Sequence, residues 1–367
     1  MRKLIFVIAT ILLINSNLLF PAKIKLKNRF PLHCGDKQEL YLSGGISVDP
    51  YGNFIIPDAK VSNIKIFSKS GRLLKVIGRK GVGPAEFLIP FRNVSDSKRL
   101  AFLDFGRRRC FVYEFAGPAQ LKDIKQGKSI PVNAGVDCCL YNDLLFLAAF
   151  VLDPDGNSCE LYSVNLTNGK TSYVLPSHEK YGLSSTAEYR KVYRNTNSIV
   201  AIGTQGYCDA YNGKVYYVWE GDLRILRIDI KTGDIEEFWI KTDKYVQPFV
   251  SDRLAIAYEQ KERMVMAVEK SKFSIIDDIN VSKNYIVLSY MTPSKTAGRR
   301  SRMLQFYGHD MKFISEIEAP KEVSFSDEDE SAVICMNRET DSLIFLRRFL
   351  DAKDEDKFEI LVYNIYR

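Results

Sequence analysis

Few side chains in this sequence are suited to binding a metal ion or acting as a general base. The chain has three histidines, His33, His178 and His309, which stand near the amino terminus, in a connection between repeated units and in an outer hairpin. Side chains in such unlike contexts are not expected to converge on one point. We therefore expect no metal site, no cofactor and no catalytic residue.

The cysteines give no metal or redox motif either, because none of them is in CxxC spacing. They are Cys34, Cys110, Cys138, Cys139, Cys159, Cys208 and Cys335. Several lie inside apolar strand runs, where cysteine behaves as a small hydrophobic residue, so we expect buried thiols. A single disulfide in an oxidising compartment stays open as the alternative.

Two carboxylates, Asp58 and Asp104, each end an apolar strand directly before a polar loop. The backbone N–H groups of such a loop need acceptors, and a carboxylate can supply them. We expect this structural role, with a paired-acid active site as the alternative. The nearby glycines Gly78, Gly81 and Gly83 suit a turn with positive φ better than a phosphate loop, because no helix start with Lys-Ser/Thr follows.

Two predicted loops are rich in basic residues. The first carries Arg79, Lys80, Arg107, Arg108 and Arg109, and the second carries Lys295, Arg299, Arg300 and Arg302. If they lie on one face of the molecule, they could attract an anionic glycan, a carboxylate or an acidic protein loop. The alternative is ordinary solvated charge. Trp219, with Tyr216 and Tyr217, is either a stacking platform for a sugar or packing within the core.

Composition and charge exclude some classes of partner. Hydrophobic residues make up 46% and charged residues 26% of the chain, which are globular values, and the 20 Tyr and 22 Phe favour strands over helices. A net charge of +7 over 367 residues is too modest for a general nucleic-acid or membrane surface. We expect no nucleic-acid partner and a monomer.

The amino terminus is typical of an exported protein. Arg2 and Lys3 precede an apolar run over residues 4–20, the pattern of a secretory signal peptide. Phe20 and Ala22 form a poor cleavage site, so residues 1–22 are predicted to be either a signal peptide or an uncleaved membrane anchor. The protein is predicted to be periplasmic or extracellular, with this segment as its only membrane contact.

Residues 44–77 break into four short strands separated by turns, DPYGN and KSG among them, which is the pattern of one propeller blade. The next unit repeats it, since NFIIPD aligns with RLAFLD and NIKIF with RCFVY, about 46 residues further on. Predicted blades cover about residues 44–82, 90–127, 136–175, 206–242, 273–319 and 331–367. The segment at 251–270 has a helical composition, with Ser251 as a candidate N-cap, and is predicted to be an insertion.

The last unit contains only three strands, whereas the segment KIKLK near the amino terminus alternates polar and apolar residues without a neighbouring partner. A ring closed by strands from both ends has no open edge. The sequence therefore predicts an all-β six-bladed propeller over residues 23–367, in which residues 23–29 complete the last blade.

The stretch GRKGVGPAEFLIPFRNVSD at 78–96, followed by LAFLDFGRRRCFVYEF at 100–115, resembles the NHL repeat, and the chain resembles bacterial exported six-bladed propellers of unassigned activity. Ala85 departs from the glycine usual there, and Asp137, Cys138 and Cys139 have no counterpart in the pattern. The resemblance implies an exported, non-catalytic propeller that binds a protein or glycan through its loop face. Because some six-bladed relatives are enzymes, the alternative is a hydrolase or lyase with an axial calcium or zinc.

Overall fold

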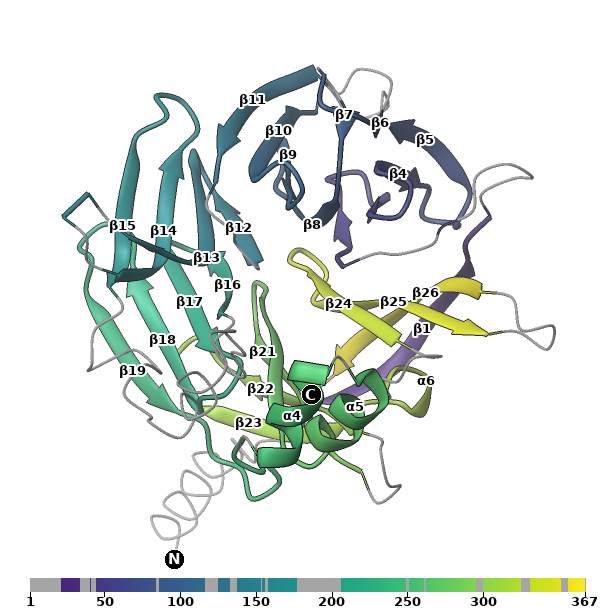
Figure 1. Cartoon of the computed structure of the whole chain (residues 1–367), viewed down its shortest axis with the longest axis vertical. Coiled ribbons are helices and arrows are strands. Elements are labelled where there is room, and N and C mark those ends of the chain that lie inside the picture. The colour runs from purple at the N-terminus through teal and green to yellow at the C-terminus, as the bar shows by residue number, and fades with distance from the viewer. Residues whose placement is uncertain are drawn as a thin grey trace, which may run out of the picture.

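The structure is a computed structural model in which six four-stranded antiparallel sheets are arranged around a central axis (Figure 1). It describes residues 21–33, 40, 44–83, 86–115, 125–132, 137–152, 154–155, 158–176, 206–248, 251–260, 262–294, 300–324, 331–350 and 356–366. Residues 1–20 of the predicted leader, Cys34 and His178 lie outside these residues.

The first three blades follow each other along the chain, and each runs from an innermost strand at the axis to an outer strand. Blade 1 contains β2 (Ser47–Val48), β3 (Phe54–Asp58), β4 (Asn63–Phe67) and β5 (Leu73–Ile77). Blade 2 contains β8 (Pro90–Ser95), β9 (Arg99–Asp104), β10 (Arg109–Glu114) and β11 (Lys125–Pro131). Blade 3 contains β12 (Asp137–Tyr141), β13 (Leu144–Leu152), β14 (Ser158–Asn165) and β15 (Thr171–Pro176). Between blades 1 and 2, β6 (Arg79–Lys80) and β7 (Glu86–Phe87) form a short parallel pair.

The remaining blades complete the ring. Blade 4 contains β16 (Gly206–Tyr211), β17 (Lys214–Trp219), β18 (Arg224–Asp229) and β19 (Ile235–Trp239). Blade 5 contains β20 (Ile275–Val281), β21 (Ile286–Pro293), β22 (Arg300–Tyr307) and β23 (Phe313–Glu318). Blade 6 contains β24 (Ser331–Asn337), β25 (Ser342–Leu350), β26 (Asp356–Tyr366) and β1 (Lys23–Pro31).

The amino-terminal strand closes the ring, as predicted. β1 pairs antiparallel with β26, from Lys23 opposite Tyr366 to Pro31 opposite Glu359. Ile24 packs into the apolar cluster between blades 5 and 6, whereas Phe30 packs into the cluster between blades 6 and 1. Strands from the two ends of the chain therefore lie side by side in blade 6.

The predicted insertion is also present. It contains α4 (Asp252–Gln260) and α5 (Arg263–Lys270), between blades 4 and 5. The Ser251 hydroxyl accepts a hydrogen bond from the Leu254 backbone N–H at 3.1 Å, which confirms it as the N-cap. A further short helix, α6 (Lys321–Ser324), lies between blades 5 and 6.

The core lies between blades. The described residues form six apolar clusters, and each cluster joins two neighbouring blades, so that every blade packs on both sides. The predicted repeat appears in the register, because Phe54 pairs with Phe67 in blade 1 as Leu100 pairs with Tyr113 in blade 2. Successive strands bury apolar side chains against the next blade, which leaves only the innermost strands facing the axis.

Candidate functional site

Each innermost strand pairs on one side only, so its other edge presents unpaired backbone groups toward the axis. Side chains of neighbouring blades satisfy several of them. The Ser95 hydroxyl donates to the Val48 carbonyl of β2 at 2.6 Å, and Asp137 accepts the Cys208 N–H of β16 at 2.9 Å. Polar side chains on the inner strands are therefore part of the ring's construction as well as the lining of its axis.

Arg92 of β8 reaches across the axis. Its guanidinium donates to Asp137 of blade 3 at 2.8 Å and to the Gly44 carbonyl of blade 1 at 3.1 Å. It also lies 3.6 Å from a carboxylate oxygen of Asp278 in blade 5 and 5.9 Å above the Tyr207 ring of blade 4. One arginine thus contacts four other blades, which places its head group on the axis.

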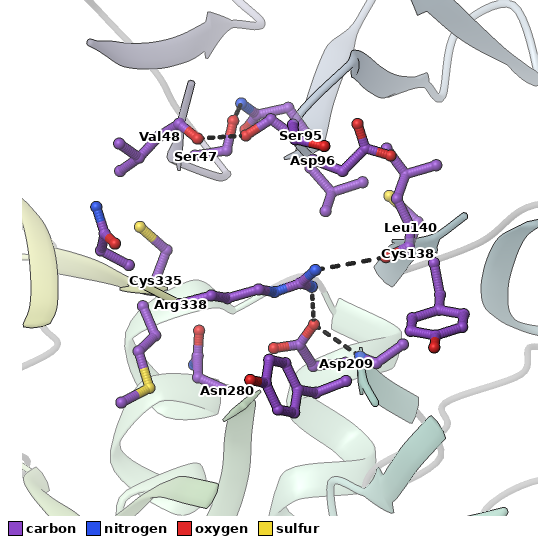
Figure 2. A pocket seen from close by; sticks show the side chains of 18 of the residues that line it. Ser47, Val48, Ser95, Asp96, Cys138, Leu140, Asp209, Asn280, Cys335 and Arg338 are labelled. Carbon is purple, nitrogen blue, oxygen red and sulfur yellow. Dashed lines mark hydrogen bonds and ion pairs between the residues drawn. The ribbon is translucent and has the colours of Figure 1, made fainter. Parts of the chain in front are cut away.

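Arg338, in the hairpin after β24, is the second arginine that reaches across the axis. Figure 2 shows its guanidinium between Asp209 of blade 4, with which it forms an ion pair, and the Leu140 carbonyl of blade 3. Asp209 also accepts backbone N–H groups from Ala210 at 2.8 Å and from Val281 of blade 5 at 2.7 Å. These contacts join blades 3, 4, 5 and 6.

Neighbouring residues hold the Arg338 hairpin in place. The Lys283 N–H donates to the Arg338 carbonyl at 3.2 Å, and Asp341 accepts hydrogen bonds from Ser282 and Asn284 of blade 5. Arg338 is therefore presented to the axis by a hairpin that is itself anchored to the next blade.

A cavity of about 1280 Å³ extends along the axis. The innermost strands of all six blades line it, together with the hairpins that join first and second strands in blades 1, 2, 3, 4 and 6. The Arg92 side chain lies at the end formed by the first residues of those strands. Among the described residues, the face beyond Arg92 contributes to the lining only Gly45 and Ile46, which lead into β2. We infer that the cavity opens on the hairpin face and ends at Arg92.

The lining is polar and contains more acidic than basic side chains. Its acidic members are Asp49, Asp96, Asp137, Asp143, Asp209, Asp278 and Glu339, and its basic members are Arg92, Lys98, Arg99 and Arg338. Near the mouth, Asp143 forms an ion pair with Arg99, while Asp49 and Asp96 accept backbone N–H groups of their own turns. The excess of carboxylates makes this cavity a poor site for an anion.

Burial and pairing shift the titration of the charged groups on the axis. Burial opposes the charge of both arginines, but the neighbouring carboxylates outweigh this effect and raise the pKa of Arg92 and of Arg338. Burial raises the pKa of Asp209 against the effect of Arg338, and raises the pKa of Asp278 further against the effect of Arg92. Asp278 is therefore the carboxyl on the axis most inclined to hold a proton.

Two buried amides on the axis have polar atoms that find no hydrogen-bond partner among the residues that the structure describes. They are Nδ2 of Asn280 and Oδ1 of Asn93, and each residue is 7% exposed. Both line the cavity, and Asn280 lies beside Asp209 in Figure 2. Because buried polar groups are rarely left unpaired, these atoms mark places where a bound molecule would find a partner.

The thiols agree with the prediction of buried cysteines in the described part of the chain. Cys110, Cys138, Cys139, Cys159 and Cys208 are buried, Cys335 is partly buried, and these six are free. Burial raises the pKa of the Cys138 and Cys208 thiols, so both are neutral at physiological pH.

Those of the predicted basic residues that the structure describes do not line the cavity. Those of the first loop belong to connections on the opposite face of the ring, where Arg79 pairs with Glu86 at 2.9 Å and Arg107 donates to the carbonyls of Gly83 and Glu86. Lys80 is exposed in β6, Arg108 has a positive φ of 50°, and Arg109 begins β10. As a ligand site, this loop stays a prediction.

The second predicted loop is only partly described, because Lys295 and Arg299 lie outside the described residues. Arg300 is buried and donates to the Lys270 carbonyl of α5. Arg302 is buried too, and donates to Asp277 at 2.9 Å and to the Ala332 carbonyl of blade 6 at 2.7 Å. The prediction that Arg300 and Arg302 face a ligand is wrong in this structure, because both guanidinium groups join elements of the fold.

Trp219 is likewise not a stacking platform. It is 1% exposed, packs edge-on against Tyr217 with ring centroids 4.9 Å apart, and donates its indole N–H to Glu160 of blade 3. The packing alternative is the observed one. A sugar cannot reach a ring that is already enclosed between two blades.

The structural predictions for Asp58 and Asp104 are confirmed. Asp104 accepts the backbone N–H of Arg107 in the loop that follows at 3.1 Å, and also those of Leu88 and Ile89 before β8, both at 2.8 Å. Asp58 accepts those of Lys60 and Val61, and forms a buried ion pair with Lys65 at 2.7 Å. Neither is near the axial cavity lining.

His309 supports the cavity mouth indirectly. Its ring stacks on Tyr211 with centroids 5.3 Å apart, and its Nε2–H donates to the Ser282 carbonyl at 2.9 Å. Tyr211 is one of the residues that line the cavity. The histidine therefore fixes an aromatic ring at the mouth.

Sequence reasoning did not identify the axial residues Arg92, Asp137, Asp209, Asp278 and Arg338 as a site. A signal was present, because each acidic residue stands in a short apolar strand that begins a blade, where a charged side chain is out of place. Asp137 was noted as a departure from the repeat without a role. A polar residue on a first strand is what an axis-facing position requires.

The fold and the axial cavity define the class of this protein as a six-bladed β-propeller. A family model described as a 6-bladed beta-propeller matches residues 46–193. That description confirms the propeller but not the NHL repeat, which stays a prediction. A search of curated proteins found no match.

Two solved structures from Bacteroides resemble the whole chain. A member of the DUF4221 family from Bacteroides vulgatus is 14% identical, with a TM-score of 0.65, over 95% of this chain and 99% of that one. A Bacteroides fragilis protein described as exported is 15% identical, with a TM-score of 0.60, over 94% and 96% of the two chains. At these identities the likeness shows the fold alone.

Among the helices that the structure describes, none is both long enough and apolar enough to cross a membrane.

Proposed function

We propose that this protein is an exported, non-catalytic propeller that binds the end of a glycan chain in its axial cavity. The observation that carries the proposal is the cavity itself, which draws its lining from all six blades and from the hairpins between first and second strands. A concave site with converging polar groups is the usual form of a ligand site, and the axis of a ring is a frequent place for one.

The chemistry of the lining favours a sugar. Its uncharged members near the mouth are Ser95, Ser97, Asn142, Asn212, Asn337 and Thr340, with Tyr141 and Tyr211 beside them. Hydroxyl and amide groups both donate and accept hydrogen bonds, as sugar hydroxyls do, and tyrosine offers an apolar ring. The volume exceeds the range of about 300–1,000 Å³ of most small-molecule sites, which leaves room for more than one sugar ring.

The acidic excess argues against the anionic glycan that the basic loops suggested. It also does not provide a metal centre. In the described residues no group of three or more His, Cys, Asp or Glu side chains is placed to hold a metal ion. Asp137 and Asp209 are instead paired with Arg92 and Arg338, so the alternative of an axial-metal hydrolase or lyase gains no support from this part of the chain.

Export rests on the predicted leader at residues 1–22 and on the likeness to a fold relative described as exported. A site for glycans is useful on the outside of the cell, where such polymers are found. Whether the protein is released or stays anchored in the membrane follows from whether the leader is cleaved.

The test is a binding measurement with neutral oligosaccharides by isothermal titration calorimetry, on the purified protein and on a variant with a blocked mouth. Lys98 is exposed on the β8–β9 hairpin and lines the cavity. Lys98→Trp should abolish binding because the indole fills the opening. Lys69→Trp is the matched control, since Lys69 is equally exposed on a hairpin away from the cavity. Binding that survives Lys98→Trp, or the absence of any binding oligosaccharide, would overturn the proposal.

A further inference from the structure

The inner part of the axial cavity holds one more carboxylate than guanidinium. Arg92 and Arg338 supply two positive charges, whereas Asp137, Asp209 and Asp278 supply three carboxyl groups. Each of the five comes from a different blade, and all line the same cavity. A buried charge without a partner is costly, so the third carboxyl must hold a proton or pair with a bound cation.

The distances identify Asp278 as the carboxyl left over. Asp137 accepts from Arg92 at 2.8 Å and from the Cys208 N–H at 2.9 Å, and Asp209 pairs with Arg338 and accepts the Val281 N–H. Asp278 lies 3.6 Å from Arg92, beyond hydrogen-bonding distance, and among the described residues it accepts only the N–H of the next residue, Ile279. It is 6% exposed.

The surroundings of Asp278 show what sets its protonation. Burial raises its pKa and Arg92 opposes this, while the nearby carboxylates add to the rise. The titratable and charged groups that face it are Arg92, Asp137, Asp209, Asp277, Tyr207 and Cys335. Asp277 is itself paired with Arg302, and Tyr207 and Cys335 are neutral because burial raises the pKa of each. No second cation is therefore available to Asp278 among the described residues.

Two unpartnered amides point independently to a bound molecule here. Asn280 lies two residues after Asp278 on β20, so both side chains lie on one face of that strand, and its Nδ2 has no partner. Asn93, across the ring in blade 2, is held with its Nδ2 on Ser47 at 2.6 Å, and its Oδ1 is the other polar atom of the lining without a partner among the described residues. A ligand that carries an ammonium group next to a hydroxyl would satisfy the carboxylate of Asp278 and the donor of Asn280 together.

We propose that the inner end of the axial cavity is an ammonium subsite, in which Asp278 pairs with the positively charged amine of an amino sugar. This inference rests on the proposed glycan-binding function and narrows its ligand to glycans with a free amine. In the empty protein Asp278 holds a proton. On binding the proton leaves to solvent, the carboxylate pairs with the ammonium, and the charges on the axis balance.

The experiment compares two ligands that differ only in the charge of the amine. Glucosamine oligomers carry ammonium groups, and N-acetylglucosamine oligomers of the same length carry neutral amides. Calorimetry on the purified full chain should show binding of the glucosamine oligomer at least about tenfold tighter, with release of a proton. Asp278→Asn should lower the affinity for the glucosamine oligomer by at least about tenfold and make the two oligomers bind alike.

Asp310→Asn is the matched control, because Asp310 lies on an exposed outer hairpin of blade 5 and pairs with Lys312. It should leave the preference intact. Should Asp278→Asn fail to fold, proton release by the unmodified protein decides the matter, measured in buffers of different ionisation enthalpy at a pH where the free amine is fully protonated, since a neutral subsite releases none.

The outcomes separate the two proposals. Equal binding of the two oligomers by the unmodified protein, or a preference that Asp278→Asn retains, overturns the ammonium subsite and leaves glycan binding standing. Failure of either oligomer and of neutral oligosaccharides to bind overturns both. Binding of a lysine-containing peptide in place of any glycan also overturns both, because the source of the ammonium would then be a protein.

Discussion

At the scale of single residues, this ring buries charge only where a partner is at hand. Asp58 and Lys65 are 0% and 1% exposed and form an ion pair at 2.7 Å inside blade 1. Taking two charges out of water is expensive, and their attraction offsets the cost only while both are present. The intact ion pair therefore contributes little net stability, whereas removing one of its two partners is strongly destabilising.

We expect Lys65→Met to lower the free energy of unfolding by about 3–5 kcal/mol, because it leaves the Asp58 carboxylate buried without a cation. The double variant Asp58→Asn with Lys65→Met should recover most of this loss, since asparagine still accepts the loop N–H groups of Lys60 and Val61. Urea denaturation of the three proteins measures both values. A double variant less stable than Lys65→Met would contradict the argument.

A second residue-scale prediction concerns Tyr113. Its hydroxyl is buried with no hydrogen-bond partner in the described part of the chain, and burial raises its pKa to about 12. The unfolded chain loses this proton near pH 10, whereas the folded protein keeps it, so stability is full below about pH 10 and falls as the pH rises toward 12. Tyr113→Phe should reduce that fall and change the stability at neutral pH by less than about 1 kcal/mol. Melting temperatures of both proteins across this pH range give the comparison. An equally steep fall with pH in the two proteins would contradict the prediction.

At the scale of elements, turns decide how one blade follows the next. Gly78 ends blade 1 with a φ of +79°, and a Cβ atom there would lie 2.0 Å from the ring of Phe87. Phe87 is fully buried and packs edge-on against Phe102 and Phe111, with centroids 4.7 and 5.2 Å away. The glycine thus serves both the turn and the packing between blades 1 and 2.

Gly78→Ala should therefore cost about 3 kcal/mol or more, the sum of backbone strain and overpacking. Gly169→Ala is the matched control, because Gly169 has a φ of +76° but nothing within 4 Å of an added Cβ atom. It should cost only about 1 kcal/mol, the strain alone. Thermal unfolding of the two variants gives the comparison, and equal losses would show that contact with Phe87 is unimportant.

At the scale of the whole molecule, stability depends on closure. Without β1, the long strand β26 would present an unpaired edge, and the clusters on both sides of blade 6 would lose Ile24 and Phe30. Among the described residues, apolar clusters join each blade to both of its neighbours. Removing a strand from blade 6 therefore exposes apolar side chains of blades 5 and 1.

A variant lacking residues 1–31 should melt on the order of 10 °C lower than one lacking residues 1–20, and should aggregate through the open edge of β26. The longer variant retains β1 and serves as the control. Scanning fluorimetry and size-exclusion chromatography measure the two effects. Equal melting temperatures with a monomeric elution of both variants would show that closure by β1 is dispensable.

The sequence alone determined the blades and their closure, because both follow from local chemistry. Alternating apolar residues and turn glycines define each strand. Asp58 and Asp104 accept N–H groups of the loop that follows their own strand. The lone KIKLK strand had to pair with the incomplete last blade. Ser251 as a helix cap is equally local. Each of these features is encoded within one repeat or by a missing partner.

Only the tertiary structure decided the site. Arg92, Asp137, Asp209, Asp278 and Arg338 stand in five different blades, and no spacing along the chain relates them. They meet because the ring brings the first strand of every blade to one axis. The same closure buried Trp219, Arg300 and Arg302, which sequence patterns had placed on a binding surface. Burial depends on what the neighbouring blade contributes, and that contribution comes from residues far away in the chain.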